Sequence, residues 1–432
     1  MDVEIRVKPV RLTLIVVMLV LMSAVFLPAA WGRKFKVLHT FHGKDGALPI
    51  SQLVRDAEGN LYGTTSNGGL GKCFGVNCGT VFKMDRTGKL IWSYSFHGKD
   101  GFNSWASLLR DAKGNLYGTT IWGGGPDCPG KGNPGCGVVF KLDPAGKNET
   151  VLYKFAGNCN DKRDGMNPEG VPVMDAAGNL YGTTFSGGPP LHCFGTAFAV
   201  SGTGKETILH VFKGAPDGMN GGLGLVKRGA HSLYGVTSSG GNEGQGTAFR
   251  MSTKGKETIL YNFTGGSSNG GAPASVLAFD KAGNLYGTTL IGGTNCGGDC
   301  GTVFELSPNG GGWTHKTLYV FCQLSSCDDG RQPLRGPLVL DGAGNIYGTT
   351  EEGGVQHDCN SGAGCGTVFK LDANGNETVL YSFTGGADGN APGAGLTMDD
   401  KGNLYGTAGE GGDVNCKLDV GYGCGVVFEL TP

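Results

Sequence analysis

Leu61-Tyr62-Gly63-Thr64 is the stretch that decides the fold, because it recurs along the whole chain. Seven copies occur, two of them with one conservative change, and successive tyrosines lie between 52 and 64 residues apart. A short motif at this spacing is the signature of a repeat architecture. The tyrosines of the seven copies are Tyr62, Tyr117, Tyr181, Tyr234, Tyr286, Tyr347 and Tyr405.

Each copy lies in a unit of four short extended segments. In the last unit, residues 377–383 form a β-branched and aromatic run, followed by runs at 395–399, 404–407 and 425–430. We name these strands D, A, B and C; the Asp-Lys-Gly-Asn turn at 400–403 joins A to B. No stretch carries a sustained helical period. Four short strands repeated seven times predict an all-β fold, a seven-bladed β-propeller of four-stranded blades.

The two ends of the chain predict how the ring closes. The first strand-like run, residues 35–41, matches strand D, whereas the chain ends on a C strand at 425–430. We therefore expect the N-terminal strand to complete the last blade, which removes the free edges. In the alternative assignment, D is the innermost strand, and each of the seven blades is one continuous stretch of sequence. Closure is favoured because the A–B hairpin resembles the inner hairpin of NHL-type propellers. We interpret Gly63 and its equivalents as allowing neighbouring sheets to approach closely.

Composition narrows the class of protein. The 432 residues include 83 glycines, but these have no Gly-X-Y period, so a collagen is excluded. The net charge is −2 without a basic stripe, and we expect no nucleic-acid partner. Because the repeats fill the chain, we predict one propeller domain over residues 33–432, and a monomer.

The N-terminus indicates export. Arg6, Lys8 and Arg11 precede an almost wholly apolar run at 12–27, and small residues Ala30 and Gly32 follow it. This pattern predicts a signal peptide over residues 1–32. The alternative is an uncleaved membrane anchor, since residues 12–30 are close to bilayer length. In either case the repeats lie outside the cytoplasm, as a secreted, periplasmic or cell-surface protein.

Fourteen cysteines fit an oxidising compartment and predict disulfides. Strands alternate in direction, so the D–A and B–C loops share one face, and every cysteine falls on that face. The B–C loops vary in length, as binding loops on a rigid scaffold do. Zinc is the alternative, but it needs four converging ligands and these pairs lie on different blades, so we expect no metal. The predicted pairs are Cys73–Cys78, Cys128–Cys136, Cys159–Cys193, Cys296–Cys300, Cys322–Cys327, Cys359–Cys365 and Cys416–Cys424.

A few other residues are candidates for ligand binding. Trp105 and Trp122 belong to one blade and could stack on a sugar or anchor a protein; the alternative is packing under a cysteine loop. Glu351, Glu352 and Glu410 give the last two blades an acidic bias and could form a carboxylate pair, against the alternative of solvated surface charge.

The D–A loops repeat Asp-Gly, as in Asp45-Gly46. A ring of carboxylates could hold calcium, but the repetition in six of the seven units favours a turn. We expect no cofactor. The sequence contains no recognisable catalytic motif, so it indicates no catalytic residues.

The repeated unit Asp-x-x-Gly-Asn-Leu-Tyr-Gly-Thr-Thr-x-x-Gly-Gly…Gly-Thr-Val-Phe-Lys-Leu…Glu-Thr-Val-Leu-Tyr-Ser-Phe resembles the Gloeo/Verruco (GloVer) tandem repeats of exported bacterial proteins. The resemblance covers about residues 35–432 and implies a secreted bacterial protein of unassigned activity, with no catalytic residues to transfer. The leading hypothesis is a non-catalytic binding or scaffold propeller for an extracellular or periplasmic glycan or protein. One alternative is a carbohydrate-active hydrolase or lyase with acidic residues in the central funnel. Another is a structural component of the cell envelope.

Overall fold

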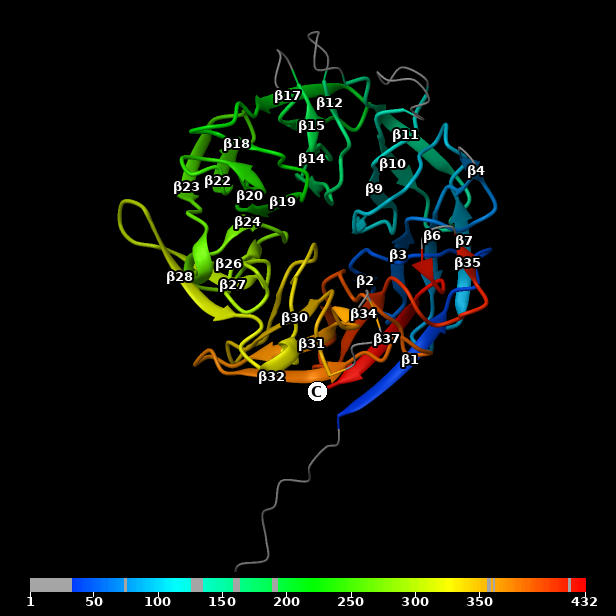
Figure 1. Ribbon diagram of the computed structural model, residues 1–432. Helices are drawn as coiled ribbons and strands as arrows, with labels where there is room; N and C mark the ends of the chain where they lie inside the picture. Colours follow the sequence, from blue (N-terminus) through cyan, green and yellow to red (C-terminus); the bar gives the residue numbers. More distant parts are fainter. Residues whose placement is uncertain are drawn as a thin grey trace, which may run out of the picture.

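Seven small β-sheets surround a central axis in the computed structural model of the chain (Figure 1). It describes residues 33–73, 76–125, 135–157, 164–188, 193–355, 359, 362–418 and 421–432. The expected signal peptide, residues 1–32, lies outside this described part. Within it, no helix has the length and apolar character needed to cross a membrane.

Each blade has four antiparallel strands, with the A strand innermost and the D strand outermost, as the sequence predicts. Blades 1 and 2 are β2 (Val54–Arg55), β3 (Leu61–Thr65), β6 (Thr80–Met84) and β7 (Leu90–Ser95), then β8 (Leu109–Arg110), β9 (Leu116–Thr120), β10 (Val138–Leu142) and β11 (Glu149–Lys154). Blades 3 and 4 are β13 (Val173–Met174), β14 (Leu180–Thr183), β16 (Thr196–Val200) and β17 (Glu206–Val211), then β19 (Leu225–Arg228), β20 (Ser232–Thr237), β22 (Thr247–Ser252) and β23 (Glu257–Asn262). Blade 5 is β25 (Ala278–Phe279), β26 (Leu285–Ile291), β27 (Thr302–Pro308) and β28 (Trp313–Val320), with β24 (Gly271–Pro273) also paired to β26. Blades 6 and 7 are β29 (Val339–Leu340), β30 (Ile346–Thr350), β31 (Thr367–Leu371) and β32 (Glu377–Ser382), then β33 (Thr397–Met398), β34 (Leu404–Ala408), β37 (Val426–Thr431) and β1 (Lys34–Thr40).

The loops carry short elements of their own. They are β4 (Lys72–Cys73) with β5 (Val76–Asn77), β12 (Gly165–Met166) with β15 (Ser186–Gly187), β18 (Gly218–Met219) with β21 (Ser239–Gly240), β35 (Lys417–Leu418) with β36 (Gly421–Tyr422), helix α2 (Gly266–Asn269) and a 3-10 turn (Ser325–Cys327).

The N-terminal strand closes the ring, which confirms the predicted phase. Strand β1 pairs antiparallel with β37, from Lys34 opposite Thr431 to Thr40 opposite Val426, and becomes the outermost strand of blade 7 (Figure 1). Phe35 stacks on the ring of Tyr381 in blade 6, with 3.8 Å between centroids. The two ends of the chain therefore hold each other, and no blade is left with a missing strand.

The core lies between the blades and is built from one repeated aromatic contact. The phenylalanine that follows each D strand meets the edge of the phenylalanine in the C strand of the next blade, with centroids 5.0 to 5.6 Å apart. Such edge-to-face pairs are the favoured geometry for buried rings. The seven pairs are Phe41–Phe82, Phe96–Phe140, Phe155–Phe198, Phe212–Phe249, Phe263–Phe304, Phe321–Phe369 and Phe383–Phe428.

The glycine of the Leu-Tyr-Gly-Thr motif makes room for this phenylalanine. A Cβ atom on Gly63 would lie 2.6 Å from Phe82 Cζ and 3.0 Å from Leu53 Cδ2. Phe82 is the direct cross-strand partner of Gly63 within the same blade. The close approach is therefore within one sheet, which corrects the interpretation of a glycine between neighbouring sheets.

Replacing this glycine tests that packing. We expect Gly63→Ala to lower the free energy of unfolding by about 1–3 kcal/mol, because the added methyl overpacks the fully buried Phe82. Urea denaturation measures the change. Gly342→Ala is the matched control, since nothing lies within 4 Å of a Cβ at this turn position. Equal effects of the two changes would contradict the steric role.

The uniform A–B turns are structural, as their repetition suggests. In the first blade the Asp56 carboxylate accepts hydrogen bonds from the Asn60 side chain and from the Tyr62 hydroxyl, at 2.8 and 2.9 Å. Burial acts to raise the pKa of Asp56, but these hydrogen bonds hold it below its usual value. The motif tyrosine thus braces the turn of its own hairpin.

Candidate functional site

The D–A and B–C loops share one face, and hydrogen bonds join them in each blade. Examples are the short antiparallel pairings of Ala47 with Asn67 and of Asn390 with Glu410. We call this side of the propeller the loop face. It is the side on which the sequence places the cysteines.

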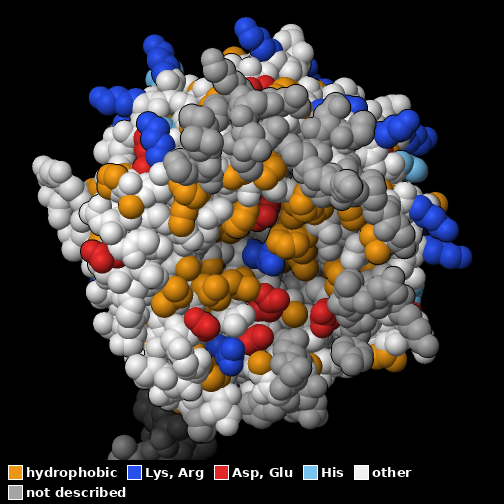
Figure 2. Space-filling model, turned by 45° about the horizontal axis from the view of Figure 1, so that its top comes forward, with side chains coloured by type: hydrophobic (Ala, Val, Ile, Leu, Met, Phe, Trp, Pro, Cys, Tyr) orange, Lys and Arg blue, Asp and Glu red, His pale blue; other side chains and the backbone are white. Residues whose placement is uncertain are grey.

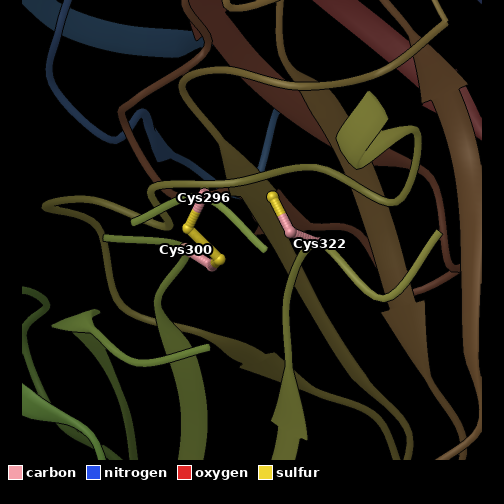
Figure 3. Close-up of side chains that lie close together, drawn as sticks. All are labelled: Cys296, Cys300 and Cys322. Carbon is pink, nitrogen blue, oxygen red and sulfur yellow. A yellow bond between two sulfur atoms is a disulfide. The ribbon is translucent and has the colours of Figure 1, made fainter. Parts of the chain in front are cut away.

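Five of the predicted cysteine pairs are disulfides in the structure, and the described residues contain no free cysteine. Cys136 and Cys193 are also disulfide-bonded, while their expected partners Cys128 and Cys159 lie outside the described residues. Figure 3 shows Cys322 close to the Cys296–Cys300 bridge, with the three sulfur atoms within 4.8 Å. Cys322 is itself bonded to Cys327, so these sulfurs are not free thiolate ligands. The five pairs are Cys73–Cys78, Cys296–Cys300, Cys322–Cys327, Cys359–Cys365 and Cys416–Cys424.

The disulfides brace a ring of hydrogen bonds between blades. The carbonyl of Cys78 accepts a bond from the N–H of Asn103 in the next blade, at 3.0 Å, and Asn103 has a left-handed φ of 61°. The carbonyl of Cys300 accepts from Gln332 in the same way, at 3.0 Å. Blade 4 has no cysteine, and there Gln245 accepts from Ala272 at 2.8 Å. Each bridged loop therefore fixes the D–A loop of its neighbour.

The Asp-Gly aspartates are turn residues. Asp100 accepts hydrogen bonds from the Tyr94 hydroxyl at 2.6 Å and from the N–H of His97 at 2.7 Å. Asp45 bonds the ring of His39 in the equivalent position. These hydrogen bonds are those of turn aspartates.

At the axis, the loop face is hollowed into a cavity of about 200 Å³, which we call the funnel. Its wall is mostly apolar, and Figure 2 shows a basic side chain at the centre, apolar side chains around it and acidic side chains nearby. A smaller cavity of about 40 Å³ is lined by residues that precede the A strands and shares part of this wall. Residues of the funnel wall include Trp105, Glu169, Leu223, Pro273, Leu290 and Arg335.

Arg335 reaches the funnel because the segment between its loop aspartate and its A strand is one residue longer than in the other blades. Leu338 follows Asp329 by nine positions, whereas Leu53 follows Asp45 by eight. The additional residue places Arg335 in the left-handed region, with a φ of 65°, and its N–H bonds the Ala274 carbonyl at 2.6 Å.

From this position in blade 6, the guanidinium of Arg335 lies 4.1 Å from the ring centroid of Trp105, which precedes the A strand of blade 2. Blades 2 and 6 are not neighbours in the ring, so the two side chains meet near the axis. The contact is a cation–π interaction at short range.

Two carboxyl groups flank Arg335. Burial raises the pKa of Glu169 to about 7, against the charge of Arg335. Burial also raises the pKa of Glu351, opposed by Arg335 and reinforced by Glu352 and Glu410. In the part of the chain that the structure describes, the side chains of Arg335, Glu169 and Glu351 have no ion pair or hydrogen bond with one another or with other groups. A guanidinium and two carboxyl groups, none with a hydrogen bond or ion pair among the described residues, therefore lie close together near the axis.

The structure places the sequence-predicted residues in different surroundings. Trp105 lines the funnel, and Glu351 lies close enough to Arg335 for the charge of Arg335 to oppose the rise of its pKa. Glu410 accepts a hydrogen bond from the Asn390 side chain at 2.9 Å, and burial raises the pKa of Glu410. Glu352 forms an ion pair with Arg331 at 2.9 Å, and Trp122 packs on the core cluster containing Phe102.

Sequence reasoning missed Arg335 and Glu169. The signal for Arg335 was a spacing between the loop aspartate and the A strand that is one residue longer than in the other repeats. Glu169 occupies the position equivalent to Trp105, five residues after the loop aspartate in each case. Comparing this position between repeats would have found Glu169.

The fold and the loop face together define a closed, disulfide-braced β-propeller with a funnel at one end of its axis. The chain belongs to the Gloeobacter/Verrucomicrobia repeat family, whose model matches residues 23–230, 71–300 and 194–418.

No curated protein matches the chain. Among solved structures, it is similar to a gluconolactonase from Xanthomonas campestris, with 12% identity, a TM-score of 0.42 and coverage of 92% of this chain and 89% of that one. A putative 6-phosphogluconolactonase from Bacteroides uniformis has 12% identity and a TM-score of 0.45, over 76% and 83% of the two chains. A luciferin-regenerating enzyme has 14% identity and a TM-score of 0.39, over 93% and 96%.

Proposed function

We propose that this protein is an exported, non-catalytic binding propeller that takes its ligand, part of a glycan or of a protein, at the funnel of the loop face. The observation that carries the proposal is a group of ionisable side chains, Arg335, Glu169 and Glu351, that make no hydrogen bond or ion pair with any described residue and lie at or near a largely apolar cavity. Charged groups withdrawn from water are costly when unpaired, so their presence there favours a site completed by a ligand.

The frame around the funnel suits a binding role. The blades repeat the same packing, whereas the loops differ in length and are braced by disulfides. Variable loops on a rigid scaffold are a common arrangement for recognition. Disulfides are typical of proteins outside the cytoplasm, which supports export through the predicted signal peptide at residues 1–32.

Trp105 offers the direct test. We expect Trp105→Ala to weaken binding roughly tenfold or more, because it removes both wall area and the support of Arg335. Glycan arrays and a library of extracellular peptides, followed by calorimetry on the hits, measure the affinity. Trp122→Ala is the control, since Trp122 packs in a core cluster away from the funnel wall. Equal losses in the two variants, with unchanged thermal stability, would contradict the site.

A carbohydrate-active enzyme is the second candidate, favoured by one observation. Glu351 and Glu410 are carboxyl groups whose pKa values are raised by burial, as a general acid requires. Turnover of a bound oligosaccharide that disappears in Glu351→Gln, but not in Glu352→Gln, would favour the enzyme over the binder. Absence of any ligand would leave the structural envelope role.

A further inference from the structure

The funnel presents one cation in a fixed position. The backbone of Arg335 is pinned to blade 5, since its N–H bonds the Ala274 carbonyl and its own carbonyl accepts from Val276. Its guanidinium lies over the ring of Trp105. A planar guanidinium carries five N–H donors in a fork that matches a carboxylate. Among the described residues these donors have no acceptor, so they are available to a ligand.

The cavity beside Arg335 suits an apolar body. Leu223, Pro273 and Leu290 line it, with the side chains of Asn220 and Ser238 as the neutral polar groups. An apolar cavity of about 150 Å³ accommodates benzene. The funnel, at about 200 Å³, therefore has room for a body of that size or slightly larger.

The charged groups around the funnel restrict the head group that a ligand can have. A cation would be drawn to Glu169 and Glu351 but would leave the N–H donors of Arg335 without an acceptor, and a dianion such as a phosphate monoester would be repelled by both carboxyl groups. The Trp105 face that Arg335 covers is closed to a stacked sugar ring. A single carboxylate is the group that satisfies the guanidinium at the smallest electrostatic cost.

We propose that the funnel binds a small monocarboxylate with an apolar body, its carboxylate on the guanidinium of Arg335 and its body against Leu223, Pro273 and Leu290. Trp105 acts as a positioning residue for Arg335. This inference rests on the proposed binding function and names the class of ligand, an aliphatic or aromatic carboxylic acid.

The test compares acids with their neutral amides at pH 8. Hexanoate and benzoate are titrated against hexanamide and benzamide by ligand-observed NMR and calorimetry. We expect the acids to bind the wild-type protein and the amides to bind at least roughly tenfold more weakly. Arg335→Gln should weaken acid binding by roughly tenfold to a hundredfold.

Two further variants distinguish a specific effect on acid binding from a general loss of structure. Arg331→Gln is the matched control, because Arg331 lies in the same loop but pairs with Glu352, and it should leave acid binding unchanged. Glu169→Gln should tighten acid binding several-fold by removing a negative charge from the wall, a gain that misfolding does not produce.

Three results would overturn the inference: equal binding of acids and amides, unchanged acid binding in Arg335→Gln, or no binding of either acid up to millimolar concentration. If a neutral saccharide or a peptide then binds and loses affinity in Trp105→Ala, the binding function stands and only the carboxylate assignment fails. If no ligand of any class binds, both fail.

Discussion

Reduction of the disulfides lowers the thermal midpoint of unfolding by roughly 10 °C or more. Each bridge closes a short loop, with cysteines four to eight positions apart. Loop-closure entropy gives each about 2 kcal/mol, and at least five act together. Calorimetry with and without a reductant measures the shift. A midpoint unchanged after complete reduction would show that the blades alone set the stability.

Hydrogen exchange tests the effect of disulfide reduction at single residues. Reduction should speed hydrogen exchange at Asn103, Gln332 and Ala391, whose N–H groups bond cysteine carbonyls of the preceding blade. Ala272 is the internal control, because its N–H bonds Gln245 in a loop without cysteine. Faster exchange at the first three with no change at Ala272 is the expected pattern. A uniform increase at all four would mean that the bridges do not act locally.

The second large effect is a loss of stability as the pH rises from about 5 to about 8. Four glutamates begin D strands at the blade boundaries, and burial raises their pKa values from 4.5 to about 8 for Glu149 and to about 7 for the others. Nearby aspartates reinforce the shift. The Oε1 atom of each is buried without a hydrogen-bond partner. The four are Glu149, Glu206, Glu257 and Glu377.

The direction in which stability changes with pH follows from proton binding. These groups hold a proton in the folded protein at pH values where the unfolded chain has released it, so their stabilisation is complete below 4.5 and is lost as the pH passes the folded pKa. After a discount for partial exposure, each contributes roughly 1 kcal/mol, or about 5 °C in the midpoint for all four. His315 acts in the opposite sense, since burial lowers its pKa to about 4, whereas the raised pKa of Glu169 adds to the effect of the four.

Glutamine variants test whether these glutamates cause the dependence of the thermal midpoint on pH. The triple variant Glu149→Gln, Glu206→Gln and Glu377→Gln should flatten the dependence of the midpoint on pH, because the amide imitates the protonated acid. Glu257 is left in place because it also pairs with His210 at 3.2 Å. Glu58→Gln, at an exposed turn, is the control. An unchanged slope in the triple variant would assign the pH dependence to other groups.

The blades were predictable because their signals are local. Leu-Tyr-Gly-Thr marks the B strand, the Asp-to-Asn turn marks the A–B hairpin, and the match between residues 35–41 and 377–383 reveals the closing strand. Short-range cysteine pairs such as Cys73–Cys78 followed from the same reasoning, since nearby cysteines in one loop have few other partners. The role of Gly63 was wrong in detail, because its contact with Phe82 depends on cross-strand register.

The sequence by itself determined the number of blades, their strand order and the side of the ring on which the cysteines lie, since each rests on contacts within one repeat. Only the tertiary structure decided the funnel. Trp105, Glu169 and Arg335 come from three different repeats, and no local pattern says which side chains reach the axis. Closure of the ring brings them together, and one inserted residue turns Arg335 toward Trp105. The physical reason is that a propeller packs its repeats sideways but leaves the axis to be filled by side chains from several blades.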